Sequence, residues 1–120
     1  MAIGTQSSIS MHSGDTRVLE ITVVDENQAA VDLSAADVTW ALSKKAADEV
    51  LPKGSALLTK VVGNGIAIVD AVTGRADVTI DPSDTEALAG DFYHELQVVL
   101  GGAVSTVLYG TVTIVKDLIQ

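Results

Sequence analysis

The stretch Gly90–Leu100, GDFYHELQVVL, decides the fold, because its apolar and polar side chains alternate. Successive side chains of a β-strand point to opposite faces of the sheet. The alternation therefore puts Tyr93, Glu95, Gln97 and Val99 on one face, and on the other it puts Phe92, His94, Leu96, Val98 and Leu100. His94 and Glu95 are neighbours in the sequence, a pairing that suggests acid–base chemistry or a metal site in many enzymes. In a regular strand they point apart, so we interpret His94 as a packing residue.

The rest of the chain repeats this alternation in runs separated by Gly, Asp, Asn and Pro. The runs predict β-strands at Thr16–Val24, Val38–Ser43, Leu57–Val62, Ile66–Val69, Arg75–Ile80 and Val104–Val115. Lys44–Ser55 mixes charges with Pro and Gly and is expected to be a loop, whereas Asp81–Ala89 predicts a short helix that Asp81 caps. We therefore expect an all-β, immunoglobulin-like antiparallel β-sandwich with one short helix before the penultimate strand.

The register of the last two strands depends on the length of the loop that joins them. A two-residue loop pairs Leu100 with Ala103 and sets the apolar faces of the two strands on opposite sides. A three-residue loop pairs Leu100 with Val104 and lets one core accept both strands. We expect the second register, which also sets His94 opposite Gly110, where a ring can lie over a residue without a side chain.

Two parts of the chain are expected to contact partners. The expected register places Tyr93, Val107 and Tyr109 together on the outer face of the last hairpin, where they suit a protein contact; ordinary cross-strand pairing on a solvated face is the alternative. Residues 1–13 are expected to form an extended arm, followed by the sandwich domain of residues 14–120. The arm could add a strand to a neighbour's sheet edge, with Ile3 and Ile9 in the contact.

Composition narrows the classes of function. The 120 residues suit one domain, and 16 Asp and Glu against 7 Lys and Arg give a net charge of −9. Such a charge disfavours nucleic acid and anionic membranes as partners, because both are bound by clustered Lys and Arg. The chain has no cysteine, which excludes disulfides, Cys-ligated zinc and a thiol nucleophile. The first residues lack the pattern of a signal peptide, and no apolar run reaches the ~20 residues that span a bilayer.

The sequence gives little support for a catalytic or ligand-binding site. His12 has a serine and an aspartate nearby in the sequence, but a catalytic triad assembles from distant segments. The acidic loops lack the ligand spacing of a calcium loop, and no Gly-rich phosphate loop precedes a helix. We therefore expect no enzymatic activity, no cofactor and no metal. Carbohydrate binding needs exposed rings, and Trp40 is expected in the core, which leaves only Tyr93 and Tyr109 for that role.

Three stretches of the chain carry a familiar set of turn and core motifs. They are residues 14–42, GDTRVLEITVVDENQAAVDLSAADVTWAL; residues 65–100, GIAIVDAVTGRADVTIDPSDTEALAGDFYHELQVVL; and residues 105–117, STVLYGTVTIVKD. Together they resemble small immunoglobulin-like proteins of tailed bacteriophages, among them the N-terminal domain of the baseplate upper protein. The shared features are Gly-Asp-Thr opening a strand, Val-Asp-Leu before a Val-x-Trp strand, and Asp-Thr-x-x-Leu-x-Gly before an aromatic-rich strand. Phe92 and His94 stand where that pattern has tyrosines, and a Phe92 ring cannot donate the hydrogen bond of a tyrosine corner.

The resemblance implies a structural protein of the virion, held in the particle by protein–protein contacts with other virion proteins and with copies of itself. A small domain with an arm fits a capsid decoration, or cement, protein. The alternatives are a tail or baseplate component and an adhesin-like module that binds host-surface carbohydrate. The expected location is the virion, after synthesis in the host bacterial cytoplasm.

Overall fold

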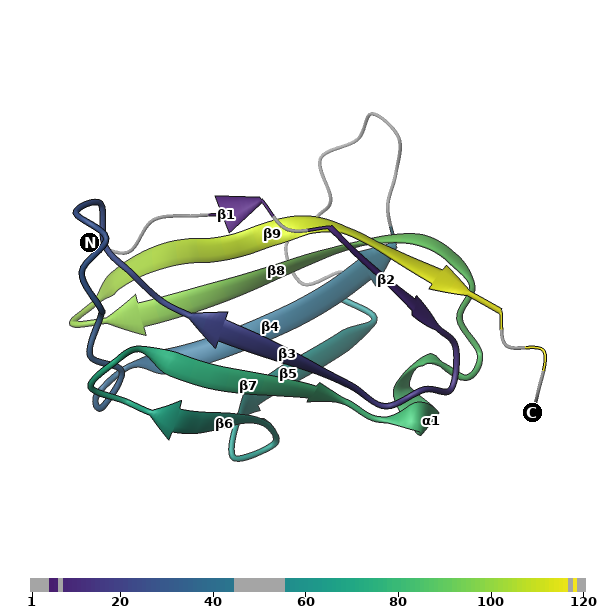
Figure 1. Ribbon diagram of the computed structural model, residues 1–120, viewed down its shortest axis with the longest axis horizontal. Helices are drawn as coiled ribbons and strands as arrows, with labels where there is room; N and C mark the ends of the chain where they lie inside the picture. The colour runs from purple at the N-terminus through teal and green to yellow at the C-terminus, as the bar shows by residue number, and fades with distance from the viewer. Residues whose placement is uncertain (1–4, 7, 45–55, 117, 119–120) are drawn as a thin grey trace.

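The computed structural model describes residues 5–6, 8–44, 56–116 and 118. In this part of the chain two layers of strands face each other, and a single short helix lies at one end (Figure 1). The elements in chain order are β1 (Thr5–Gln6), β2 (Ile9–His12), β3 (Arg17–Thr22), β4 (Asp37–Lys44), β5 (Leu58–Val62), β6 (Gly65–Asp70), β7 (Arg75–Ile80), α1 (Pro82–Thr85), β8 (Gly90–Leu100) and β9 (Ala103–Val115).

The pairing of the strands is that of an immunoglobulin-like sandwich. The hydrogen-bonded order is β1-β9-β8-β4-β5-β6-β7-β3, and β2 also pairs with β9. One layer holds β5, β4, β8 and β9, and the other holds β6, β7 and β3. The layers are connected at one side by a short parallel contact between β5 and β6, around the turn at Gly63 and Gly65. This order, with β4 and β8 central in their layer, confirms the predicted fold.

The predicted strands are present, with small changes at their ends. The helix predicted over Asp81–Ala89 is a single turn at Pro82–Thr85, and the Asp84 carboxylate accepts the backbone N–H of Asp81 at 2.7 Å, as in a capping box. Residues 45–55 of the predicted loop lie outside the described residues.

The predicted arm differs from a free extension. β2 pairs in parallel with β9 of its own chain, from Ile9 opposite Val112 to His12 opposite Val115, and β1 pairs with the same strand. Met11 is buried, and the N–H of Ser13 donates to the carbonyl of Val115 at 2.8 Å. The strand that could extend a neighbour's sheet therefore covers an edge of its own sheet, because doing so removes Met11 from water.

The β8–β9 hairpin contains both of the registers considered from the sequence. The turn is the two-residue Gly101-Gly102, both at positive φ, so Leu100 pairs with Ala103. The register then shifts by one residue opposite Leu96, which pairs with Leu108, and His94 pairs with Gly110 as predicted. The three-residue loop is therefore wrong, and the register expected from it holds only beyond this β-bulge.

The bulge reverses which side chains of β9 face the core. Before it, Ala103 and Ser105 lie opposite the inward residues of β8; after it, Gly110, Val112 and Ile114 do so. One inserted residue changes the parity of the alternation, and both apolar faces thereby meet one core.

The centre of the core is a polar pair surrounded by aliphatic side chains. Trp40 and His94 are both fully buried, and the Trp40 Nε1–H donates to His94 Nδ1 at 3.1 Å. The rings meet edge to face, with centroids 6.1 Å apart. Gly110 lies opposite His94, so no side chain competes for the space over the ring. The imidazole gives the indole N–H a partner where water cannot reach it.

A second buried polar contact ties β5 to the helix. Lys60 faces inward beside Trp40 and is 7% exposed. Its Nζ lies 2.8 Å from the Asp84 carboxylate and 3.8 Å from that of Asp81. Asp84 thus accepts from both the start of α1 and a buried cation, which fixes the helix over one end of the sandwich.

We predict that His94→Phe destabilises the protein, because it leaves the Trp40 N–H without its acceptor in the core. The expected loss in the free energy of unfolding is about 1–3 kcal/mol. Urea unfolding followed by the fluorescence of the single tryptophan measures it. Gln97→Ala, an outward residue of the same strand, is the control and should change stability by less than about 0.5 kcal/mol. Equal stability of His94→Phe and the wild type would contradict the role of the pair.

We also predict that Asp84→Asn lowers the free energy of unfolding by about 3 kcal/mol, because it removes the nearer of the two carboxylate charges that face the buried Lys60 ammonium. Adding Lys60→Met removes the cation too and should recover most of the loss. Asp70→Asn, at an exposed carboxylate, is the matched control. A double variant no more stable than Asp84→Asn alone would show that the pairing is not the cause.

Candidate protein-contact surface

The outer face of β4, β8 and β9 carries both tyrosines of the chain. Tyr93 lies opposite Ser43 on one side and Thr111 on the other, and Glu95 lies between Ala41 and Tyr109. We call the surface formed by Tyr93, Glu95, Tyr109 and Thr111 the tyrosine face. No described strand covers it, since β5 and β9 extend this layer sideways.

Tyr93 and Glu95 form a fixed pair on this face. They lie two residues apart and so point the same way, and the Tyr93 hydroxyl donates to Glu95 Oε2 at 3.0 Å. Partial burial, followed by this bond and the nearby carboxylate charge, raises the pKa of Tyr93 to about 12. The phenol is therefore neutral at physiological pH and orients the carboxylate. His94 and Glu95 point to opposite sides, as predicted, so they form no acid–base pair.

Tyr109 supplies the exposed ring. It is 39% exposed and lies directly opposite Glu95. Further along, Thr113 donates to the Asp91 carboxylate at 3.0 Å. The outward side chains of β4, β8 and β9 include acidic and hydroxyl groups and no Lys or Arg. The result is an aromatic ring beside a preoriented carboxylate, which suits a polar protein contact with an aromatic anchor.

Two of the predicted contact residues pack against the core, and a third lies outside the described residues. Val107 was expected beside the tyrosines, but it is 6% exposed and packs in the core, because the bulge turns it inward. Ile9 is half-buried and packs against the core from β2, so it stabilises its own sandwich rather than an arm contact. Ile3 lies outside the described residues. Among the predicted contact residues that the structure describes, Tyr93 and Tyr109 lie on the outer face as the sequence placed them, and their contact with a partner stays a prediction.

The other chemical candidates are dispersed. His12 is exposed on β2 and pairs with Val115 near the end of β9, beyond the residues of the tyrosine face. Asp25 uses its carboxylate to hold its own turn, accepting from the N–H groups of Asn27 and Ala29. Among the described residues, no group of three His, Cys, Asp or Glu side chains is arranged to hold a metal.

Comparison with known proteins identifies no family for the chain. No protein-family model matches the chain, and no curated protein matches it. Among solved structures, a protein named Tim-1 is similar over 98% of this chain and 99% of its own, with 10% sequence identity and a TM-score of 0.47. That similarity is too low to carry an argument about function, and the immunoglobulin-like assignment stands on the strand order.

The described part of the chain holds no helix with the length and apolar character needed to cross a bilayer.

We predict that Tyr93 titrates with a pKa of about 12 in the folded protein. Because this pKa lies above the ordinary value of 10.0, the neutral phenol favours folding below pH 10, and that stabilisation is lost as the pH rises from 10 to 12. A Tyr109→Phe background leaves one tyrosine to follow by its ultraviolet absorbance. Adding Glu95→Gln should lower the pKa, since it removes the carboxylate charge. Circular dichroism must show a folded chain throughout, and an unchanged midpoint in Glu95→Gln would refute the pairing.

Proposed function

We propose that this chain is a non-enzymatic structural protein of a tailed-bacteriophage virion, and specifically a capsid decoration protein that acts through protein–protein contacts. The proposal combines the sequence resemblance to small immunoglobulin-like phage proteins with the character of the tyrosine face. The single observation that carries it is the exposed Tyr109 ring beside the fixed Tyr93–Glu95 pair, on a sheet face that no described strand covers.

The chemistry of this face supports binding rather than catalysis. The Glu95 carboxylate on this face is paired with the neutral phenol of Tyr93. His94, the histidine next to it in the sequence, is buried on the other side of the sheet. A rigid sheet loses little conformational entropy on binding, and a tyrosine brings a large contact area with few rotatable bonds. The partners would be other virion proteins, with further copies of this chain.

Imaging particles assembled with and without this chain tests the location. A decoration role predicts that particles lacking it lose external density on the head and release their DNA more readily on heating. Tailless or non-adsorbing particles with intact heads would replace the decoration role with a tail or baseplate role. Particles that never contain the chain would overturn the virion proposal altogether.

We predict that Tyr109→Ser weakens attachment to particles at least about tenfold, as expected for an aromatic anchor at the centre of an interface. The measurement is rebinding of purified protein to depleted particles. Val18→Ser, at an exposed residue on the opposite layer, is the matched control and should bind normally. If the wild-type protein binds a glycan array and Tyr109→Ser does not, while both attach equally well to particles, the carbohydrate-binding alternative would be favoured instead.

A further inference from the structure

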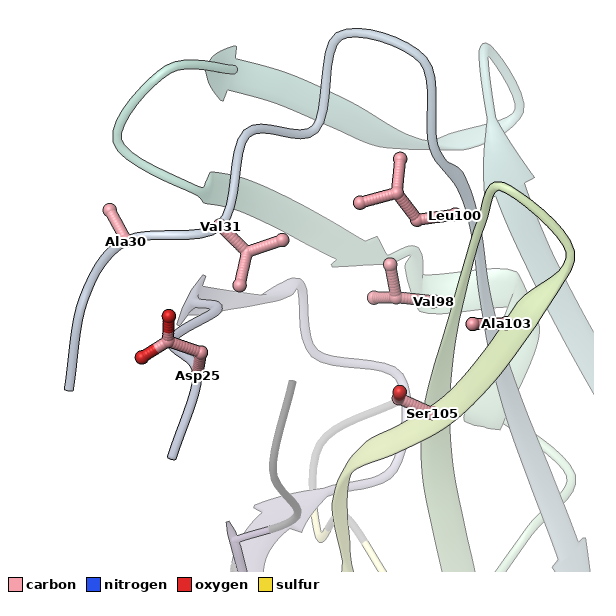
Figure 2. Close-up of a pocket in the computed structure, with 7 residues that line it drawn as sticks. All are labelled: Asp25, Ala30, Val31, Val98, Leu100, Ala103 and Ser105. Carbon is pink, nitrogen blue, oxygen red and sulfur yellow. The ribbon is translucent and has the colours of Figure 1, made fainter. Parts of the chain in front are cut away.

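A groove of about 460 Å³ opens at the end of the sandwich where β8 turns into β9. One wall is the tip of the β8–β9 hairpin, and the other is the connection between β3 and β4 (Figure 2). Most of its lining side chains are aliphatic; the lining residues are Asp25, Ala30, Val31, Val98, Leu100, Ala103 and Ser105. We call it the end groove. It is separate from the tyrosine face, which lies on the outside of the same layer.

The bulge in β9 explains why the end groove is open. Before the bulge, the inward positions of β9 hold the small residues Ala103 and Ser105, opposite Leu100 and Val98. Val104, which a three-residue loop would place inward opposite Leu100, is turned out by the two-residue turn and is 58% exposed. Two small side chains at the mouth of the core leave a concave apolar surface there.

The opposite wall is held in place by backbone bonds. The N–H of Val31 donates to the carbonyl of Val23 at 3.0 Å, and the N–H of Val23 donates to the carbonyl of Gly74 at 2.8 Å. Gly74 has a φ of +74°, and a Cβ there would lie 2.5 Å from the Val23 carbonyl oxygen. This close backbone approach makes the wall rigid, so the end groove is formed before anything binds.

The charge at the rim is negative and fixed. The N–H groups of Ala29 and Asn27 donate to Asp25 Oδ1, at 3.0 and 2.8 Å, and these bonds lower the pKa of Asp25, which keeps it ionised. Both bonds use Oδ1, and among the described residues Oδ2 accepts none. The loop from residue 24 to 36 also carries Glu26 and Asp32 and has no Lys or Arg.

We propose that the end groove docks a short segment of another protein that presents one aliphatic side chain next to a lysine or arginine. The aliphatic side chain packs against Val31, Val98 and Leu100, and the cation pairs with Asp25 Oδ2. The complementary charge selects a basic segment. A second copy of this chain is a weaker candidate for this groove, because it offers 7 Lys and Arg against 16 Asp and Glu. This inference does not depend on the virion role.

Nuclear magnetic resonance with isotope-labelled protein tests the proposal. The probes are three capped tripeptides, Lys-Leu-Lys, Glu-Leu-Glu and Lys-Ser-Lys. Lys-Leu-Lys is expected to shift the backbone amides of Val31, Ala103 and Ser105 in a saturable way, and added salt should weaken it. The other two should bind at least about tenfold more weakly, because one lacks the attractive charge and the other the apolar anchor. Equal binding of Glu-Leu-Glu, or no shift at these amides with Lys-Leu-Lys, would overturn the proposal.

Two variants connect the binding to the end groove. Asp25→Asn keeps an Oδ1 acceptor for the turn and removes the charge, so it should weaken Lys-Leu-Lys about threefold or more. Asp77→Asn, on the outer face of the other layer, is the matched control and should have no effect. Ala103→Leu fills the end groove from an exposed position and should abolish the shifts. Full binding by Ala103→Leu, or concentration-dependent dimers that use these amides, would show a different site or a second copy as the occupant.

Discussion

One extra residue in β9 determines which side chains of the last two strands face the core. Without the bulge opposite Leu96, the tight Gly101-Gly102 turn would set the apolar faces of β8 and β9 on opposite sides of the sheet. With it, Phe92, His94 and Leu96 share the core with Val112 and Ile114, while Tyr109 is turned outward. The fold, the tyrosine face and the end groove all follow from this change of parity.

The buried polar groups reinforce the same register. His94 accepts the Trp40 N–H only when β4 and β8 pair as they do, and Gly110 leaves space for the ring only in the register beyond the bulge. Lys60 reaches Asp84 only if β5 and α1 lie at the same end of the sandwich. A slip of one residue would bury an unsatisfied donor or an unpaired ammonium, and both are costly in a core. These contacts therefore specify one arrangement among the sandwiches that the apolar pattern permits.

Two surfaces of different shape result, and they suit different partners. The tyrosine face is formed by paired strands beyond the bulge, and its side chains lie beside their cross-strand neighbours. The end groove is concave and apolar with an ionised rim, and it is formed by a tight turn and an irregular connection. A structural protein that contacts a lattice on one side and a flexible segment at one end would use both. The acidic charge of the chain favours basic partners at either surface.

The sequence by itself determined the sandwich, its strands and the separation of His94 from Glu95, because alternation, Gly-containing turns and the cap of α1 are local signals. It also placed Tyr93 and Tyr109 on one outer face. The position of Val107, the pairing of β2 with its own sheet and the end groove were decided only by the tertiary structure. The residues around Gly101 are compatible with either of two strand registers. The hairpin uses one register near the turn and the other beyond the bulge, and this combination depends on how β9 packs against strands distant in the sequence. The role of Asp25 could not be predicted from the sequence for the same reason. Its turn becomes one wall of the end groove only because the β8–β9 hairpin lies next to it in the folded chain.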